Sequence, residues 1–346
     1  MASMQKTKSK QFGLDIGTSA IRLVEVEPGQ ERPGLACHGS KPLPADLTSI
    51  NAGADKKRLA DLIKQLKDQA GAKSNEVVVS LPAENFYVSV VQVPQMSDSE
   101  FNAHIFPKMS EQMSIPQDSL RIDWHIVNRS VGEGEMLVFV VAASSDAVEA
   151  YVDIINSAGL NLRAVEINAL ALARSVIKDG RKPVIVLDFG QKTSEVAAIW
   201  QRVPYRSRFI NAGEAVFASA IAQSLNVDME EAHQFLKQYG ASTTKFDGQI
   251  LKAIRTPLDN MVRSITDAAN AFAEYSMEAK IEKVIITGSI TAMPEAPSYI
   301  ADHTNLPVEI ANPWTNIAYP ATRHEQLMSQ SMDYAVASGL ALRDFV

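Results

Sequence analysis

The sequence predicts an α/β protein built from two lobes that face one cleft. The pattern Asp-x-Gly occurs twice, at Asp15 to Gly17 and at Asp188 to Gly190, each time directly after an apolar strand. One copy lies near the N-terminus and the other lies just past the middle of a chain of 346 residues, which is long enough for about two domains. The recurrence of this strand-loop-strand unit indicates two related lobes.

Each of these loops has the chemistry of a phosphate site. A strand that ends in Asp and then Gly places a carboxylate beside a tight turn, whose backbone N–H groups can surround an anion. The carboxylate can hold the hydrated Mg²⁺ that accompanies a phosphate. We therefore expect one nucleotide to bind between the two loops.

The first half of the chain alternates apolar strands with amphipathic helices. Leu59, Ile63 and Leu66 recur at helical spacing, and Ser97 followed by Glu100 has the form of a helix N-cap. Gly and Pro residues mark 28–44 as turns. We expect strands at 11–16, 20–26 and 76–81 with a helix at 55–71, then strand 86–93, helix 98–113, strands 120–127 and 136–143, helix 146–158 and strand 162–167.

The second half repeats this order. We expect strands at 184–187 and 195–200 around the second loop, helices at 217–225, 229–239 and 251–279, a strand at 283–287 and a final helix at 325–343.

The net charge, the cysteine content and the length of the apolar runs exclude several classes of protein. The net charge of −7 argues against a general nucleic-acid or anionic-membrane surface, so no nucleic-acid partner is expected. Cys37 is the only cysteine, which fits a reducing compartment. The longest apolar run, at 136–143, is far shorter than the roughly 18 residues of a membrane span. We expect a cytoplasmic protein.

Other catalytic chemistries have little support. The six His residues form no close metal-ligand pair, and neither His-Glu-x-x-His nor Gly-x-Ser-x-Gly is present.

Both loops, together with the apolar strand that runs into Thr287-Gly288, resemble the actin-like ATPase superfold. The segments DIGTSAIRLVE at 15–25, MSDSE at 96–100 and YAVASGLALR at 334–343 narrow the resemblance to the PilM family of type IV pilus assembly proteins, which is related to FtsA. The strand-helix-strand-strand module within 84–165 also resembles that branch. The resemblance implies a first lobe at 1–83, completed by 166–182 and the C-terminal helix 325–346, the inserted subdomain at 84–165 and a second lobe at 183–324.

The resemblance implies ATP or ADP with Mg²⁺ in the interlobe cleft. It assigns the Mg²⁺ shell to Asp15 and Asp188, through water. Glu166 lies near the interlobe connection and could face the attacking water, although a structural role for Glu166 is the favoured alternative. Asp15 and Asp188 could also simply cap turns, and Arg22 could be a strand-surface residue. The implied nucleotide-binding residues are Asp15, Gly17, Thr18, Ser19, Arg22, Asp188, Gly190, Gln191, Thr193, Gly288 and Ser289.

Several positions depart from the family pattern on the adenosine side. Gly288 is the one glycine kept in its loop, and His233 and Leu236 stand where relatives have a Glu and a Lys that frame the adenosine. A leucine cannot replace a cationic hydrogen-bond donor. We therefore expect weak nucleotide binding and very slow or absent turnover.

The resemblance favours an adaptor over an enzyme. It implies that a groove at the inserted module takes the short N-terminal cytoplasmic peptide of a PilN-like inner-membrane protein. It also implies contact with pilus motor ATPases, possible self-association, and recruitment to the membrane through partners without an anchor of its own. The alternatives are an ATP-hydrolysing small-molecule kinase of the same fold and an FtsA-like division filament, which the end of the chain soon after Arg343 disfavours.

Overall fold

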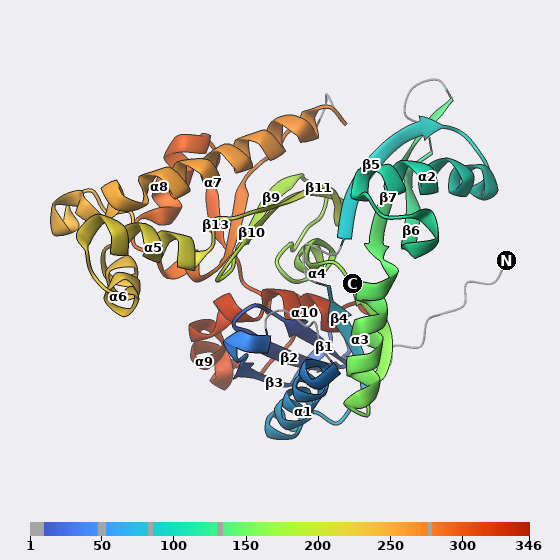
Figure 1. Ribbon diagram of the computed structural model, residues 1–346, viewed down its shortest axis with the longest axis horizontal. Coiled ribbons are helices and arrows are strands. Elements are labelled where there is room, and N and C mark those ends of the chain that lie inside the picture. The colour runs from blue at the N-terminus through green and yellow to red at the C-terminus, as the bar shows by residue number, and fades with distance from the viewer. Residues whose placement is uncertain (1–9, 48–52, 82–85, 130–133, 276–278) are drawn as a thin grey trace.

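The computed structural model describes residues 10–47, 53–81, 86–129, 134–275 and 279–346. Two lobes and an inserted module surround a central cleft, with the second lobe and the module above the first lobe in Figure 1. Strands and helices alternate as the sequence predicts, so the α/β fold class is confirmed. The expected boundary at 83/84 lies outside the described residues.

The first lobe is a five-stranded sheet covered on both faces by helices, in the order β3-β2-β1-β4-β8. Phe12 and Leu14 of β1 belong to the core that α1 and α3 cover, and Val24 of β2 belongs to the core beneath α10 on the other face. The elements are β1 (Gln11–Ile16), β2 (Ala20–Glu27), β3 (Gly34–Pro42), η1 (Ala45–Leu47), α1 (Gly53–Ala70), β4 (Glu76–Ser80), α3 (Ser145–Ser157), β8 (Asn161–Glu166), α4 (Asn168–Ser175), η6 (Ala321–Arg323), α9 (His324–Ser329), η7 (Ser331–Asp333) and α10 (Ala335–Ala341).

The inserted module is a three-stranded sheet with one helix on it. Ser97 and Glu100 form a capping box, in which each side chain bonds to the backbone N–H of the other, and so α2 begins where the sequence predicts. Phe101, Ile105 and Met109 are the buried stripe of α2. The elements are β5 (Phe86–Pro94), α2 (Asp98–Met113), η3 (Gln117–Ser119), β6 (Leu120–Asn128) and β7 (Glu135–Ser144).

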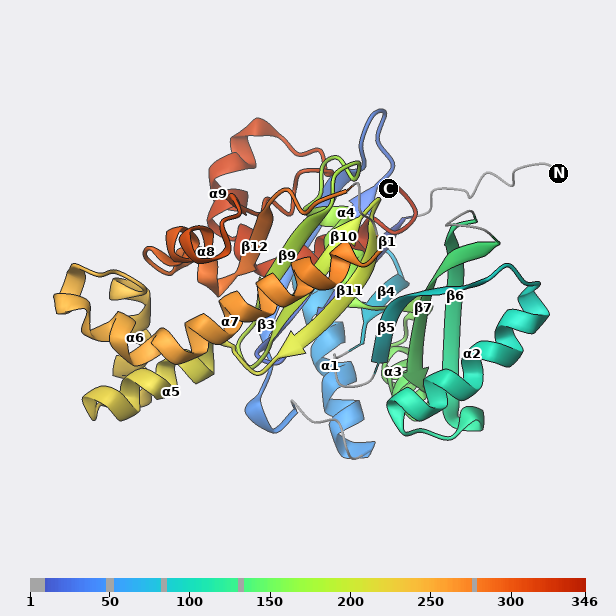
Figure 2. The same cartoon turned by 90° about the horizontal axis from the view of Figure 1, so that it is seen from above.

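The second lobe shares its sheet with the module. A single residue pair, Arg206 with Ser89, joins β11 to β5, which gives one eight-stranded order β13-β12-β9-β10-β11-β5-β7-β6. The module and the pair α5–α6 lie at opposite ends of the molecule (Figures 1 and 2). The remaining elements are β9 (Val184–Phe189), β10 (Ser194–Trp200), β11 (Val203–Ile210), α5 (Glu214–Leu225), α6 (Met229–Tyr239), η4 (Lys245–Gly248), α7 (Gln249–Ala273), β12 (Val284–Gly288), η5 (Ser289–Ala292), α8 (Ala296–Thr304) and β13 (Val308–Ile310).

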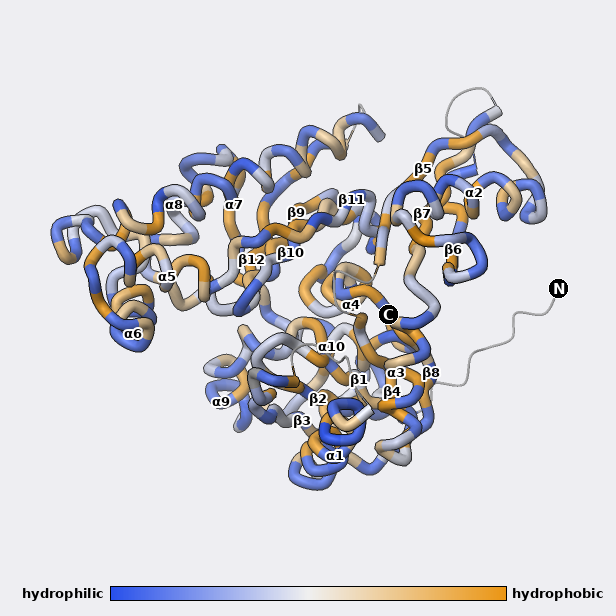
Figure 3. The backbone as a smooth tube through the Cα atoms, in the orientation of Figure 1, coloured by the Kyte–Doolittle hydropathy of each residue, from blue (hydrophilic) through white to orange (hydrophobic). Residues whose placement is uncertain are grey.

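The lobes meet at two short helices, α4 and α10. Both are strongly hydrophobic, as Figure 3 shows, and α10 is buried along its whole length. Gly339 of α10 lies so close to α4 that a Cβ there would come within 1.8 Å of the Ala171 carbonyl oxygen. Asn168 of α4 and Ala335 of α10 also line the central cavity, so the α4–α10 crossing lies at the wall of the cleft.

The structure differs from the sequence-based expectations in several places, and α4, β11, α8 and β13 are elements that were not expected at all. The expected helix 325–343 is two helices separated by η7, because Tyr334 leaves the helical conformation and packs against Trp314. Strand β8 pairs with β4, and α3 packs on α1, so these two elements of the segment expected as the inserted subdomain, 84–165, lie against the first lobe. Segment 34–42, expected as turns, is strand β3.

Candidate functional site

The two Asp-x-Gly loops converge on a cavity of about 720 Å³ between the lobes. Its volume lies within the range of roughly 300–1,000 Å³ that small-molecule sites occupy. Each of the eleven residues expected to bind nucleotide lines it: Asp15, Gly17, Thr18, Ser19, Arg22, Asp188, Gly190, Gln191, Thr193, Gly288 and Ser289.

The two loops have the same hydrogen-bonded turn. The Gly17 N–H donates to the Ala20 carbonyl at 3.0 Å, and the Gly190 N–H donates to the Thr193 carbonyl at 3.2 Å. In each lobe this turn reverses the chain between two antiparallel strands. The repeat seen in the sequence is therefore a repeat of backbone structure.

The residue seven positions after each aspartate faces that aspartate across its hairpin. Arg22 pairs with Asp15 in the register of β1 and β2, and Glu195 pairs with Asp188 in the register of β9 and β10. Both Arg22 and Glu195 line the cavity. The two related hairpins thus present a cation from the first lobe and a carboxyl group from the second.

Arg22 connects two acidic residues of the cavity wall. Its Nη1 lies 3.7 Å from Asp15 Oδ2, and its Nη2 donates to Asp333 Oδ1 at 2.9 Å. Burial alone would lower the pKa of Arg22, but the two carboxylates outweigh burial and raise its pKa above the ordinary value. Arg22 is therefore held as a charged group inside the cleft.

Three carboxyl groups of the cleft resist ionisation. Burial raises the pKa of Asp15 against the opposing effect of Arg22. Burial, with the nearby Asp15 charge, raises the pKa of Asp188 to about 6, and burial raises the pKa of Glu195 to about 8. A cation bound beside these groups would stabilise their ionised forms.

The third loop of the cleft, at Gly288 and Ser289, combines a backbone that packs tightly against Phe189 with a buried hydroxyl group. Gly288 has φ +83°, and a Cβ there would lie 2.2 Å from the Phe189 carbonyl oxygen, so this position requires glycine. The buried Oγ of Ser289 has no hydrogen-bond partner among the described residues. An unpaired buried hydroxyl beside a cavity is the kind of group that a ligand satisfies.

Helix α6 contributes no side chain to the cavity wall among the described residues. Leu236 is 3% exposed and belongs to the second-lobe core. His233 Nε2 lies 4.0 Å from Glu214 Oε1, and of these two residues only Glu214 lines the cavity. Neither of the two altered positions, His233 and Leu236, is therefore part of the described cavity lining.

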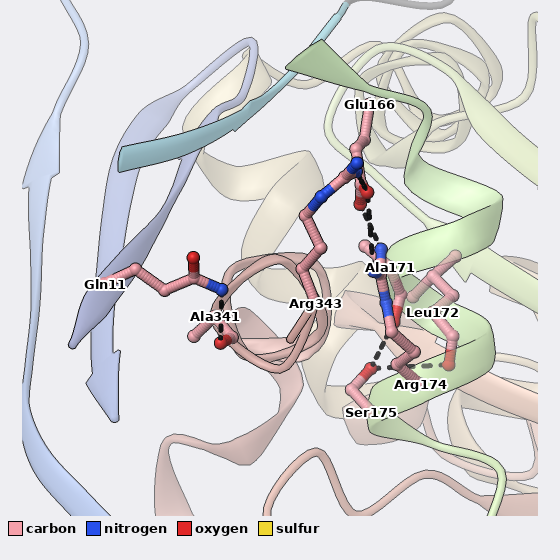
Figure 4. A network of polar contacts seen from close by, with 8 residues as sticks. All are labelled: Gln11, Glu166, Ala171, Leu172, Arg174, Ser175, Ala341 and Arg343. Atoms are coloured by element: carbon pink, nitrogen blue, oxygen red, sulfur yellow. Dashed lines mark hydrogen bonds and ion pairs between the residues drawn. The ribbon is translucent and has the colours of Figure 1, made fainter. Parts of the chain in front are cut away.

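Glu166 lies outside the cavity lining, in a buried ion-pair cluster with two arginines (Figure 4). Arg174 and Arg343 both donate to its carboxylate, with one Arg174 Nη1 to Oε1 distance of 3.4 Å. Burial lowers the pKa of Arg174 to about 10. The structure places this carboxylate between β8, α4 and the C-terminal segment, and its proposed contact with an attacking water gains no geometric support.

The cavity residues that were missed in the sequence include Glu195, Asn168 and Asp333. Glu195 was detectable, because it follows Asp188 by the same seven residues that separate Arg22 from Asp15. Asn168 begins α4, and its buried Oδ1 has no partner among the described residues. Asp333 gave no signal, because its role depends on the break between α9 and α10.

The residues fit a metal-bound nucleotide in part. The loops, Arg22 and the two aspartates match a phosphate with its cation, and the orphaned polar atoms of Ser289, Asn168 and Glu195 are available to a ligand. The second-lobe side has no cationic side chain in the described lining. The phosphate half of the site is therefore more complete than the adenosine half.

A second cavity of about 790 Å³ lies on the module between α2 and β6. Asp98, Asn102 and Phe106 form one stripe of α2 that faces Ile122 and Trp124 of β6. Trp124 Nε1 donates to Asn102 Oδ1 at 2.8 Å across this groove. β6 is the edge strand of the eight-stranded sheet.

Among the described helices, none has the length and hydropathy that crossing a membrane requires.

Known proteins give a consistent classification. The family model of type IV pilus assembly protein PilM matches residues 13–345. The structure is similar to that of a PilM-PilN type IV pilus biogenesis complex, with a TM-score of 0.82 and 26% identity over 98% of this chain and 99% of that one.

Two more distant structures share the fold. MreB 5 of Spiroplasma citri bound to AMPPNP matches with a TM-score of 0.56 and 14% identity over 95% of this chain and 94% of that one. Ethanolamine utilization protein EutJ from Carboxydothermus hydrogenoformans matches with a TM-score of 0.56 and 15% identity over 96% of this chain and 89% of that one. Since the family model covers almost the whole sequence, the chain belongs to the PilM family of actin-like type IV pilus assembly proteins.

Proposed function

We propose that this protein is an adaptor of the inner-membrane platform that assembles type IV pili, recruited by a PilN-like membrane protein. The observation that carries the proposal is the full-length similarity to a protein solved in a PilM-PilN complex. The partner would present a short N-terminal cytoplasmic segment to the inserted module. Pilus motor ATPases and further copies of this chain are the other partners we propose.

Two cavities border the module and differ in what they offer a peptide. The α2–β6 groove has a free sheet edge and partly exposed Trp124. The central cavity extends to the junction of β7 and α3, and the branch of the cavity there is lined by Ser144 of the module and by Leu81, Ala147 and Ala150 of the first lobe. We place the peptide in this branch, because it joins the module to the first lobe and adjoins the phosphate loops.

A labelled synthetic peptide of the partner's cytoplasmic N-terminus tests this placement by fluorescence anisotropy. Ala150→Trp fills the branch and should abolish binding, whereas Trp124→Ala should leave the affinity unchanged. Loss of binding in Trp124→Ala alone would move the site to the α2–β6 groove. Absence of binding to the folded wild type would contradict the adaptor proposal.

We also propose that the cleft binds Mg-ATP or Mg-ADP weakly and hydrolyses ATP very slowly or not at all. Asp15 and Asp188 would hold the hydrated Mg²⁺, while Gly17, Thr18, Ser19, Arg22, Gly190, Gln191 and Thr193 would surround the phosphates. Gly288 and Ser289 would face the nucleoside. The bound Mg²⁺ would neutralise the phosphate charge.

Isothermal titration with Mg-ATP and a phosphate-release assay test the nucleotide proposal. We expect weak binding without steady phosphate release. Micromolar affinity together with steady release would instead favour the kinase or ATPase alternative. Light scattering that rises with protein concentration in ATP would favour a filament-forming protein.

A further inference from the structure

Arg22 lies over the first phosphate loop, where a ligand phosphate is expected. A Cβ built on Gly17 would lie 3.2 Å from Arg22 Nη1. The side chain of Arg22 is only 17% exposed, and its buried Nε has no hydrogen-bond partner among the described residues. Arg22 is also the one cationic side chain in the described cavity lining.

The charge of Arg22 is already compensated by two carboxylates. Asp15 belongs to the loop itself, but Asp333 comes from η7, far along the chain, and makes the shorter contact of the two, at 2.9 Å. A charge-assisted hydrogen bond of this length is among the stronger polar contacts in proteins. A phosphate that approaches the loop therefore meets an arginine whose attraction is offset by Asp333.

Asp333 lies where η7 meets the third loop and the start of α10. η7 contacts β12 and η5, which carry the third loop, and the next residues form α10. Tyr334 is 4% exposed and packs against Trp314 and His38, so the backbone beside Asp333 is anchored. The side chain of Asp333 itself is half exposed, which leaves it free to separate from Arg22 without disturbing the core.

We propose that Asp333 is a positioning residue that occupies the Arg22 guanidinium over the first phosphate loop, so that a nucleotide phosphate must displace Asp333 to bind Arg22. The inference rests on the proposed nucleotide binding in this cleft. Asp333 then sets the affinity of the cleft for phosphate, and the displacement reports occupancy of the phosphate loops to η7 and the third loop. The free cleft is held in a low-affinity state by its own ion pair.

Isothermal titration of the full chain with Mg-ADP and, separately, with Mg-pyrophosphate tests the proposal. Asp333→Asn should bind both probes at least about fivefold more tightly than the wild type, in the range of ordinary coupling between sites. Asp333→Glu keeps the carboxylate and should keep the wild-type affinity. In the Arg22→Ala background, Asp333→Asn should have no effect, which separates control of Arg22 from a general structural role.

Asp153→Asn is the matched control, because it breaks a 2.9 Å ion pair with Lys56 outside the cavity lining. Its affinity should equal that of the wild type. Should Asp333→Asn fail to fold by circular dichroism, Asp333→Ser replaces it. Tighter binding that persists without Arg22, or equal affinity in wild type and Asp333→Asn, overturns the inference while nucleotide binding stands. Absence of binding in both overturns the nucleotide proposal and this inference together.

Discussion

At the scale of single residues, the two hairpins of the cleft differ at one equivalent position, Arg22 in the first lobe and Glu195 in the second. The carboxyl group of Glu195 accepts a hydrogen bond from the Ser207 hydroxyl at 2.5 Å through Oε1, while the buried Oε2 has no partner among the described residues. Burial of this carboxyl group favours its protonated form. Ionisation of Glu195 in the folded second lobe therefore costs free energy of folding.

Glu195→Gln should remove this cost. The folded pKa of Glu195, about 8, lies above its ordinary value of 4.5, so the folded state binds the proton more tightly and wild-type stability falls as pH rises through this interval. Thermal unfolding between pH 5 and pH 9 should show the variant gaining stability over the wild type towards high pH, by about 1 kcal/mol or more. A difference that is constant across pH would contradict the assignment.

At the scale of elements, the crossing of α4 and α10 leaves no room for a side chain at Gly339. A Cβ there would lie 1.8 Å from the Ala171 carbonyl oxygen, and backbone cannot move aside as a flexible side chain does. Gly13 of β1 faces α10 in the same way, since a Cβ there would lie 2.2 Å from the Ala337 carbonyl oxygen. Glycine residues therefore set both the distance between α4 and α10 and the distance between β1 and α10.

Gly339→Ala should destabilise the protein by about 1–3 kcal/mol, because overpacking outweighs the better helix propensity of alanine. Urea denaturation measures the change. Gly53→Ala at the start of α1 is the matched control, since no described residue lies within 4 Å of its added Cβ. Equal stability of Gly339→Ala and the wild type would mean that the crossing can widen.

Elements with a local signal could be predicted from the sequence, whereas elements that depend on pairing or contacts elsewhere in the chain could not. β1, α2 and α6 are set by local signals: an apolar run, a capping box at Ser97, and the N-cap Asp228, whose carboxylate accepts from the Glu231 N–H. β3 was missed because the Gly and Pro residues of 28–44 indicate turns, although 34–42 pairs with β2 as the second strand of a hairpin. The α9–α10 break was missed because the contacts of Tyr334 with Trp314 and of Asp333 with Arg22 join separate segments of the chain. The loops of the cleft were predictable from the repeat, whereas Asp333 and Asn168 reach it only through the fold.

At the scale of the whole molecule, the module is attached to the second lobe more closely than its place in the chain implies. β5 joins β11 through the Arg206–Ser89 pair, and Phe86 packs against Phe209 with ring centroids 5.7 Å apart. The Tyr275 hydroxyl donates to the Val90 carbonyl at 3.0 Å. The module therefore bridges the two lobes, because its last strand leads directly into α3 of the first.

Tyr275→Phe should weaken this bridge by about 1 kcal/mol, the usual net contribution of one hydrogen bond. In native-state hydrogen exchange, we expect the amides of β5 to exchange faster in the variant, while those of β9 and β12 keep the wild-type rates. Uniform acceleration across the second-lobe sheet would show that the sheet opens as one unit.

The burial of α10 has a consequence for biosynthesis. The Gln11 side chain of β1 donates to the Ala341 carbonyl across 330 positions of the chain, and α10 fills one face of the first-lobe sheet. A ribosome-bound nascent chain that has not yet reached α10 leaves that face of β1 exposed to water and to chaperones. The second lobe, whose strands and helices lie within 184–310, can form earlier, so the lobe that begins the sequence is the last to be completed.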